Sequence, residues 1–405
     1  MIAVTGLGVM APHGADPDTL FDALLRGESA VRPVCPELAR PAAAATVPGF
    51  DPAPWFTRLQ LAGVDRVSQL AVAAAARARQ DAAIPDALPG TRIGVYVGCA
   101  LGGGAALEAA FTAHARGSRM PPLSIPASMA NAPAALVALR QRALGPVLTY
   151  AVACASSAIA IAEAAKALRC GEIDVALAGG AEALIVPGVV HAWQAMQTLA
   201  RLDDGPPARA CRPFAADRSG FVLGEGAAFL VLETLACARA RGARVHAELA
   251  GWGLGNDAHH LTAPDAAGQA RTLRAALALA GLAPSEVGYC NAHGTATPVG
   301  DVVEAQALRE VWGGALPELA VSSTKALHGH LLGAAGALEA VVTVLALQRR
   351  RLPPNAHCEL PDPACALPLV PAGGAEAPTL SAAISNSFAF GGSNAVLVFR
   401  RACGA

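Results

Sequence analysis

The sequence predicts an α/β protein in which mixed β-sheets are covered by helices. Apolar, strand-like segments alternate with Ala-rich helical segments along the chain, which is the pattern of an α/β fold. The second half repeats the order of the first, so we interpret the chain as an internal duplication of one α/β unit. A length of 405 residues also favours two core-forming halves over a single hydrophobic core.

The first half opens on a short apolar strand that is expected to run into a glycine turn at Gly6 and Gly8. These glycines match a dinucleotide-binding fingerprint, but no helix and no acidic residue follow at the required distances, so a structural turn is favoured. The elements expected after it are strands at Arg92–Val97, Leu148–Ala153, Asp174–Ala178 and Phe229–Glu233, and helices at Ser156–Leu168 and Ala236–Arg241.

The second half opens on the segment His246–Leu254, which resembles the first strand and its glycines. The elements expected after it are a helix at Ala267–Ala280, strands at Val287–Ala292 and Leu319–Ser322, a long helix from about Gly333 to Gln348, and closing strands at Ala382–Ser385 and Ala395–Phe399. The combination of strand, turn and small-residue helix thus occurs twice, at Tyr150–Ala165 and Val321–Ala337. We expect the halves to be residues 1–240 and 241–405.

Composition excludes several classes of protein. The net charge is −1, which does not resemble the basic footprint of a nucleic-acid-binding protein. The first basic residue is Arg26, so we expect no signal peptide. The apolar stretch Leu331–Leu347 contains Glu339 and several small residues, which indicates a buried helix rather than a membrane span. We therefore expect a cytoplasmic protein with no nucleic-acid or membrane partner.

One of the ten cysteines lies where a nucleophile would be useful. None forms a C-x-x-C pair, so neither a disulfide framework nor a zinc site is expected. Cys154 lies where a buried strand turns into a helix, and the free N–H groups of a helix start favour a thiolate. Its small neighbours leave room for a substrate. This segment alone is equally compatible with an inert buried cysteine.

Two histidine-containing loops favour the catalytic interpretation. His293 follows the strand Val287–Ala292, and His330 follows the strand Leu319–Ser322, with Lys325 between that strand and His330. In a duplicated α/β fold, loops that follow equivalent strands converge on one crevice. We therefore expect Cys154, His293 and His330 to meet there.

Four ordered motifs resemble those of the β-ketoacyl-acyl-carrier-protein synthases, and the resemblance extends from Val4 to Phe399. The motifs are Val152-Ala-Cys154-Ala-Ser-Ser, His293-Gly-Thr-Ala-Thr-Pro298, Ser323-Thr-Lys325 followed by Gly329-His330, and Asn386-Ser-Phe388-Ala-Phe390-Gly-Gly-Ser-Asn394. The resemblance implies a thiolase-type fold, a duplicated five-layer αβαβα architecture, usually as a homodimer. A heterodimer with a chain-length-factor-like subunit is the alternative assembly.

The resemblance also implies a decarboxylative Claisen condensation. An acyl group on Cys154 would react with malonyl-acyl-carrier protein to give a 3-ketoacyl-carrier longer by two carbons. No cofactor would be bound, because the carrier protein supplies its own 4′-phosphopantetheine arm, and no metal is implied. The pathway would be fatty-acid elongation or a type II polyketide or polyene pathway.

The resemblance assigns roles to individual residues. The N–H groups of Cys154 and Phe390 would form an oxyanion hole, and His293 and His330 would hold the malonyl thioester oxygen. Lys325 and Glu304 would orient the imidazoles. Asp301 and Glu339 would support the residues that orient the imidazoles, or would form simple ion pairs. Thr295 and Thr297 would hydrogen-bond the pantetheine arm, and Phe388 would contact the substrate. Phe390 would act as a gate, and Leu101 would lie at the acyl pocket or in the core.

Three positions depart from the family pattern. Ala389 replaces a usual Gly, and its Cβ is expected to stiffen the gate. His328 is expected to be a solvent residue or a pocket wall. The stretch 61–64, Leu-Ala-Gly-Val, replaces a basic cluster, so carrier docking is not expected there.

Rival functions fit the motifs less well. A chain-length partner subunit generally lacks the nucleophile, which is present here. A thiolase-like acyltransferase would need a second reactive cysteine near the C-terminus, and a starter-type synthase would carry Asn in place of one histidine. A Cys–His hydrolase would leave the second histidine and the lysine without a role.

Overall fold

The structure is a computed structural model of the chain, and it describes residues 1–85, 87–202 and 205–402. Among these residues, ten strands form one mixed sheet in the order β11-β10-β14-β15-β9-β1-β8-β6-β4-β5. Their bounds are β1 Ile2–Met10, β4 Ile93–Gly98, β5 Val147–Tyr150, β6 Val175–Glu182, β8 Gly226–Thr234, β9 Ala247–Asn256, β10 Tyr289–Asn291, β11 Ala320–Ser322, β14 Ala382–Phe388 and β15 Ser393–Arg400.

The sheet consists of two copies of one arrangement. The first half has the order β1-β8-β6-β4-β5 and the second half β9-β15-β14-β10-β11. In each half the first two pairs are antiparallel and the last two are parallel. The halves meet where β1 pairs with β9. The predicted internal duplication is therefore confirmed, whereas the division of the chain at residue 240 stays a prediction.

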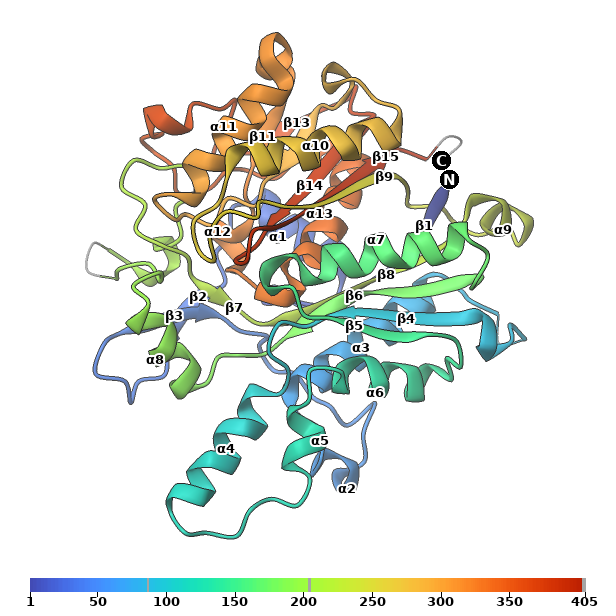
Figure 1. Ribbon diagram of the computed structural model, residues 1–405, viewed down its shortest axis with the longest axis vertical. Helices are drawn as coiled ribbons and strands as arrows, with labels where there is room; N and C mark the ends of the chain where they lie inside the picture. The colour runs from blue at the N-terminus through green and yellow to red at the C-terminus, as the bar shows by residue number, and fades with distance from the viewer. Residues whose placement is uncertain (86, 203–204, 403–405) are drawn as a thin grey trace.

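Helices form three layers around and between the two half-sheets (Figure 1). Helices α7, Ser156–Arg169, and α13, Ala335–Arg349, lie between the halves and contact each other. The outer face of the first half is covered by α3, Arg66–Asp81, and α6, Ala132–Gln141. The outer face of the second half is covered by α10, Ala266–Ala280, and α11, Gly300–Trp312. This arrangement is the predicted five-layer architecture.

Among the residues described, one segment, Leu332–Arg349, is long and apolar enough to cross a membrane when judged by length and composition alone. Helix α13 is part of this segment. Most of that segment is buried inside the protein. It is thus a core helix of the central layer, in agreement with the prediction of a buried helix.

The opening strand differs from the prediction. Strand β1 continues through Gly6 and Gly8 to Met10, so the expected glycine turn is wrong. A Cβ built at either glycine would lie 2.2 Å from a backbone oxygen of α3, Ala78 O for Gly6 and Ala74 O for Gly8. The glycines therefore allow α3 to pack closely on the sheet, which accounts for them without a nucleotide.

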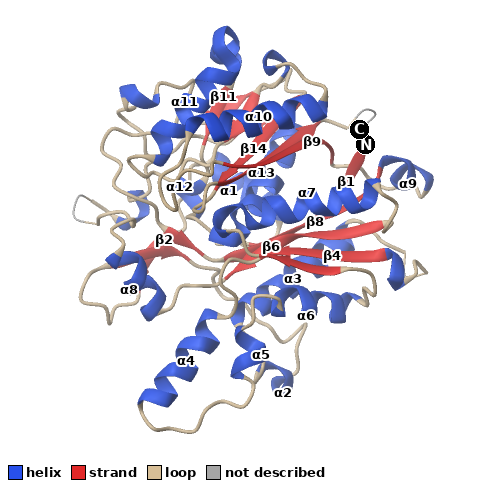
Figure 2. Cartoon of the chain, in the orientation of Figure 1, coloured by secondary structure: helices blue, strands red, loops and turns tan. Residues whose placement is uncertain are grey.

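The remaining elements connect these layers. Helices α4 and α5 project from the first half together with α2 (Figure 2). The bounds are α1 Pro17–Leu25, β2 Val31–Val34, β3 Ala42–Ala45, α2 Arg58–Leu61, α4 Gly104–Ala115, α5 Ser124–Ser128, α8 Pro187–Ala195, β7 Leu223–Gly224, α9 Leu235–Ala240, α12 Lys325–His328, β12 Arg351–Leu352 and β13 Ala375–Glu376.

Candidate active site

Cys154 is presented by a strained turn between β5 and α7. Strand β5 ends at Tyr150, three residues before the predicted end, because a 3₁₀ turn forms at Ala153–Ala155. Ala153 has φ of 43°, a left-handed conformation that is unfavourable for a residue with a Cβ. The Ser156 hydroxyl fixes the turn by accepting from the Val152 N–H at 2.9 Å and donating to the Ala153 carbonyl at 2.6 Å. The turn thus places Cys154 at the start of α7.

His330 belongs to the second half but is held by the backbone of the first. Its N–H donates to the Val222 carbonyl at 2.7 Å, and its carbonyl accepts from the Gly224 N–H at 2.9 Å. The preceding residue, Gly329, has φ of 69°, and a Cβ there would lie 2.6 Å from the Leu223 carbonyl oxygen. A glycine is therefore required immediately before this histidine.

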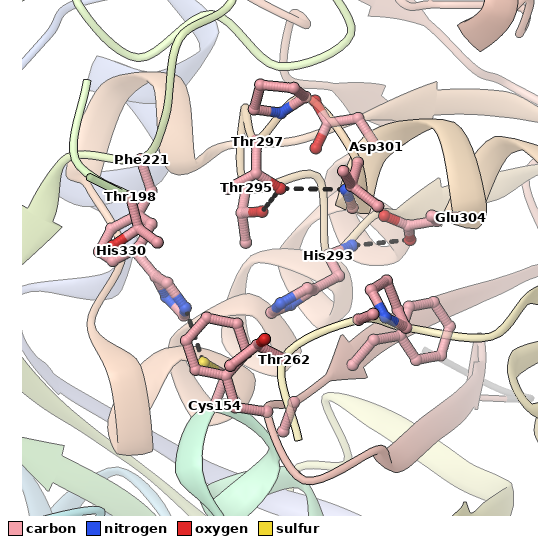
Figure 3. Close-up of a pocket in the computed structure, with 18 of the residues that line it drawn as sticks. Cys154, Thr198, Phe221, Thr262, His293, Thr295, Thr297, Asp301, Glu304 and His330 are labelled. Atoms are coloured by element: carbon pink, nitrogen blue, oxygen red, sulfur yellow. Dashed lines mark hydrogen bonds between the residues drawn. The ribbon is translucent and has the colours of Figure 1, made fainter. Parts of the chain in front are cut away.

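The imidazole of His330 contacts the cysteine directly (Figure 3). Its Nε2 lies 3.0 Å from Cys154 Sγ. The Leu332 N–H donates to the other ring nitrogen, Nδ1, at 3.3 Å. Because Nδ1 is an acceptor, the proton of the neutral ring is on Nε2, and this N–H points at the sulfur. Such a donor stabilises a thiolate.

The charge state of Cys154 reflects opposing effects. Burial raises the pKa of the Cys154 thiol to about 12, and the Lys325 ammonium acts in the opposite direction. The side chain is only half-buried, because the sulfur opens into the pocket described below. The Nε2–H group of His330 and the Lys325 charge are therefore what favours ionisation against the cost of desolvation.

His293 approaches the same sulfur from the loop after β10. Its ring lies nearly perpendicular to that of His330, with centroids 5.5 Å apart, and points toward Cys154 (Figure 3). Burial, followed by the Lys325 charge, holds the pKa of both imidazoles well below their usual value. Both rings are therefore neutral near pH 7, which suits N–H donors rather than cations.

The three side chains also have the spacing of a metal site, since their possible ligand atoms all lie within 4.8 Å of one another. The hydrogen bonding favours a different use. A metal on Nε2 of His330 would move the ring proton to Nδ1, where the Leu332 N–H already donates. The arrangement thus fits an N–H donor at the sulfur better than a metal ligand.

Glu304 acts on the backbone of the His293 loop. Its two carboxylate oxygens accept from the N–H groups of His293, at 2.8 Å, and Gly294, at 2.7 Å. The Asn386 amide donates to the same carboxylate at 3.0 Å. We expected Glu304 to orient an imidazole, so the contact differs from the prediction: the carboxylate holds the loop and not the ring.

Lys325 lies at the first position of α12 and forms an ion pair with Glu339 of α13. Both side chains are fully buried. Burial raises the pKa of Glu339 to about 7, and the lysine opposes this rise. Since Lys325 lowers the pKa of both imidazoles and of the thiol, its effect on the site is electrostatic.

A cavity of about 370 Å³ opens beside the sulfur, lined by the cysteine, both histidines and several other predicted residues. The hydroxyl oxygens of Thr295 and Thr297 lie 3.1 Å apart on its wall (Figure 3). The further predicted residues that line it are Glu304, Asp301, Phe388 and Phe390. The carboxylate of Asp301 accepts from the Phe214 N–H at 2.8 Å, so Asp301 holds a neighbouring loop.

Two sequence-based expectations need correction, and a third stays a prediction. Leu101 is 59% exposed and does not line this cavity in the single chain. His328 is neither a solvent residue nor a pocket wall, because it is fully buried and its Nε2 lies 2.9 Å from the Thr324 hydroxyl. Ala389 does not have a left-handed backbone, since the left-handed residues of that loop are Gly391 and Gly392, and the stiffening of the gate by its Cβ stays a prediction.

Comparison with known proteins identifies the family. The family model described as beta-ketoacyl synthase, N-terminal domain, matches residues 1–238, and that of the C-terminal domain matches residues 246–359. The chain belongs to the β-ketoacyl synthase family. It is therefore a β-ketoacyl synthase, an acyltransferase with a thiolase-type fold, as the motifs predicted.

Relatives and solved structures match the whole synthase. It is 40% identical to nodulation protein E from Rhizobium sp. (strain N33), over 99% of each chain. It is 36% identical to 3-oxoacyl-[acyl-carrier-protein] synthase 2 from Staphylococcus aureus (strain COL), over 99% of this chain and 98% of the relative. The solved structure of the ishigamide ketosynthase/chain length factor superposes with a TM-score of 0.92 at 34% identity, over 99% of each chain.

Residues without a motif also build the site of this β-ketoacyl synthase. The Phe221 ring lies edge-on to His330, with centroids 5.6 Å apart, and Trp193 lies next to Phe221. Glu182 ends β6, is fully buried, and accepts from the N–H groups of Ala100 and Gly333. A carboxylate at the end of an apolar strand is the sequence signal that would have indicated Glu182.

Proposed function

We propose that this β-ketoacyl synthase carries an acyl group on Cys154 and condenses it with a malonyl group held on an acyl carrier protein. The observation that carries the proposal is the 3.0 Å contact between Cys154 Sγ and His330 Nε2, with His293 beside both and all three in one cavity. The product is a 3-ketoacyl-carrier longer by two carbons, in fatty-acid elongation or a type II polyketide or polyene pathway.

Acyl transfer comes first. The Cys154 sulfur attacks the carbonyl carbon of the acyl-carrier thioester, and the oxygen of the tetrahedral intermediate accepts from the N–H groups of Cys154 and Phe390. The carbon–sulfur bond to the carrier then breaks. The carrier leaves as a thiol after taking up the proton that Cys154 lost, so the transfer involves no net gain or loss of protons.

Condensation uses the two neutral imidazoles. The malonyl thioester oxygen accepts from the ring N–H groups of His293 and His330. As the carboxylate leaves as CO₂, the electron pair of the broken bond forms an enolate, which these donors stabilise in the transition state. The enolate carbon attacks the acyl carbonyl on Cys154, and the thiolate is released when its bond to carbon breaks.

The carrier and its arm complete the proposal. The hydroxyls of Thr295 and Thr297 lie on the cavity wall, where they can donate to the amides of a 4′-phosphopantetheine arm. The name of the staphylococcal relative includes an acyl carrier protein, which supports this partner. No cofactor of the enzyme's own is proposed, and a cytoplasmic location stays a prediction.

An exposed apolar region supports a dimer. The outer edge of β5 pairs with no strand among the residues described, and Leu148 on it is 45% exposed. The projecting α4 and α5 expose Phe111 (63%) and Ile125 (71%). We propose a homodimer through this region, with a chain-length-factor-like subunit as the alternative partner. Light scattering of the purified protein distinguishes a dimer from a monomer.

Intact-protein mass spectrometry tests the nucleophile. We expect the wild-type enzyme to gain the mass of one acyl group from an acyl-carrier, and Cys154→Ala to gain none. Cys358→Ala is the matched control, because Cys358 is also half-buried but does not line the cavity. Self-acylation of Cys154→Ala would show that another residue is the nucleophile.

The histidine variants separate the two half-reactions. His293→Ala and His330→Ala should both lose malonyl decarboxylation by about 10²- to 10³-fold, because each removes a donor to the enolate. Acylation should persist in both variants, but it should be slower in His330→Ala, which also removes the donor at Cys154 Sγ. Release of CO₂ from labelled malonyl-carrier measures this step. Unchanged decarboxylation in both variants would contradict the mechanism.

The alternative roles predict different results. A chain-length partner subunit would show no acylation alone, and a thiolase-like acyltransferase would transfer acyl groups without consuming malonyl-carrier. Neither role explains why two neutral imidazoles and a buried lysine charge surround Cys154. The assembled site therefore supports the elongating condensation.

A further inference from the structure

Glu182 is a fully buried carboxylate that the proposed mechanism does not use. It is the last residue of β6, in the first half of the molecule. Its Oε2 accepts from the Ala100 N–H at 2.8 Å and from the Gly333 N–H at 3.1 Å. Ala100 belongs to the turn after β4, whereas Gly333 belongs to the turn before α13 in the second half. One carboxylate oxygen therefore joins two turns that come from different halves.

The turn before α13 is strained and closely packed. Leu332 has φ of 47°, a left-handed conformation that persists in a residue with a Cβ only where the surrounding structure imposes it. A Cβ built at Gly333 would lie 2.5 Å from the Ala100 nitrogen and 2.6 Å from Oε2 of Glu182. The glycine is thus needed for the carboxylate to reach this backbone. Glu182 helps to hold the strained residue in place through its neighbour.

The strained residue carries the N–H group that acts on His330. The Leu332 N–H donates to Nδ1 of this ring at 3.3 Å, and Nε2 of the ring lies 3.0 Å from Cys154 Sγ. The hydrogen bond that one ring nitrogen makes decides which nitrogen carries the proton. A bond of 3.3 Å is already long, so a small shift of the turn is enough to break it. Nδ1 would then be free to take the proton from Nε2.

We propose that Glu182 is a positioning residue for the condensation, which keeps the ring proton of His330 on Nε2 by fixing the turn at Leu332 and Gly333. Glu182 does not line the cavity, so it acts on the reaction only through the turn and the ring. With the proton on Nδ1, Nε2 would be an acceptor and could not donate to the enolate. The effect on decarboxylation rests on the proposed function, whereas the place of the ring proton does not.

Two measurements on the full-length protein at pH 8 test the proposal. Nitrogen NMR of histidine-labelled protein reports which ring nitrogen carries the proton, and His330→Ala identifies the signal. We expect the proton on Nε2 in the wild type and a shift toward Nδ1 in Glu182→Ala, which removes the acceptor. Gly333→Ala should cause the same shift, because its Cβ pushes the turn away from a carboxylate that is still present.

The second measurement is the release of CO₂ from labelled malonyl-carrier. In Glu182→Ala and Gly333→Ala this rate should fall by at least about 10-fold, with the roughly 10²- to 10³-fold effect of a lost donor as the upper limit. Glu182→Gln should keep the ring proton on Nε2 and most of the rate, because its amide oxygen can still accept from both N–H groups.

Glu233→Ala is the matched control for the loss of a buried carboxylate. Glu233 lies in β8, which pairs with β6, and forms an ion pair with Arg241 at 2.6 Å. It does not contact the turn before α13. Its removal should therefore lower the free energy of unfolding and leave the ring proton of His330 on Nε2.

The outcomes separate this inference from the proposed function. A ring proton that stays on Nε2 in the folded Glu182→Ala or Gly333→Ala variant overturns the role of Glu182 and leaves the proposed function untouched. A loss in Glu182→Gln as large as in Glu182→Ala also overturns it, because the charge and not the hydrogen bonds would then matter. If the ring proton shifts as expected but the wild type releases no CO₂, the proposed function fails while the action of Glu182 on the ring stands.

Discussion

Replacing Lys325 with methionine should destabilise the protein and slow the reaction of Cys154, for two separable reasons. The first is the ion pair with Glu339, in which both side chains are fully buried. Removing one partner of a buried pair leaves an uncompensated charge and costs about 3–5 kcal/mol of unfolding free energy. Chemical denaturation of Lys325→Met should show a loss of this size at pH 8.

The loss should depend on pH with a defined sign. The pKa of Glu339 in the folded protein is raised to about 7 from 4.5, and it rises further without the lysine. A carboxyl group with a raised folded pKa contributes stability that is fully present below the unfolded value of 4.5 and is lost as pH rises through the folded value. Lys325→Met should therefore be less destabilised at pH 5 than at pH 8.

The second reason concerns Cys154, the proposed nucleophile. The Lys325 ammonium lowers the pKa of Cys154, so its removal raises that pKa further above the ordinary value. When the pKa of the thiol rises by one, the thiolate population at a fixed pH falls about tenfold. Alkylation of Cys154 by iodoacetamide should slow in proportion. The double variant Lys325→Met/Glu339→Leu should recover most of the stability but only part of the alkylation rate, because the Glu339 charge, which raises the pKa of Cys154, is removed as well.

A control pair and two contrary results make this prediction decisive. Arg274 and Glu310 form an exposed pair at 2.8 Å, so Arg274→Met should cost at most about 1 kcal/mol. A loss of less than 1 kcal/mol in Lys325→Met at pH 8 would show that the buried pair contributes little. An unchanged alkylation rate in Lys325→Met would show that the lysine does not act on Cys154 through its charge.

Two further predictions concern the backbone around the site. Gly329→Ala should destabilise the protein by more than the roughly 1–3 kcal/mol of strain alone, because the new Cβ would also meet the Leu223 carbonyl oxygen. Gly313→Ala, whose φ of 51° is similar but which has open space around it, should show the strain alone in the same denaturation experiment. Burial raises the pKa of Glu182 from 4.5 to about 7, so the free energy of unfolding should fall as the pH rises from 4.5 to 7. An equal fall in Glu182→Gln would show that Glu182 does not cause it.

The sequence indicated the side chains of the proposed site because each follows a strand whose partner strands are parallel to it. Cys154 follows β5, His293 follows β10 and His330 follows β11, and the carboxyl ends of such strands lie at one edge of a sheet. Periodicity and small residues were enough to place these turns. They do not specify rotamers or distances. For this reason Glu304 was expected to contact a histidine ring, whereas its carboxylate accepts from backbone N–H groups.

Residues that act through packing left no comparable signal. Trp193 lies in a nine-residue helix with no motif, and its neighbours Phe221 and Phe390 are distant in the sequence. Leu101 shows the opposite error, since a motif match placed it at the acyl pocket, whereas the single chain leaves it exposed. Contacts between distant segments, and surfaces that a second subunit would cover, depend on tertiary and quaternary geometry.

The duplication explains how one local structure serves two purposes. The turn before α7 has a left-handed Ala153 followed by Cys154, and the turn before α13 has a left-handed Leu332 followed by Gly333. In the first copy the turn presents a side chain, that of Cys154, the proposed nucleophile. In the second copy it presents backbone N–H groups: that of Leu332 donates to His330 Nδ1, and that of Gly333 donates to Glu182.

This division has a chemical consequence. A helix start offers free N–H groups whatever residue occupies it, so the second turn does not need a reactive side chain to contribute to the site. By donating to Nδ1 of His330, it fixes the ring proton on Nε2, which is the group that faces Cys154 at 3.0 Å. The position of the proposed nucleophile and the tautomer of the histidine beside it are therefore set by the same kind of turn, used once in each half of the molecule.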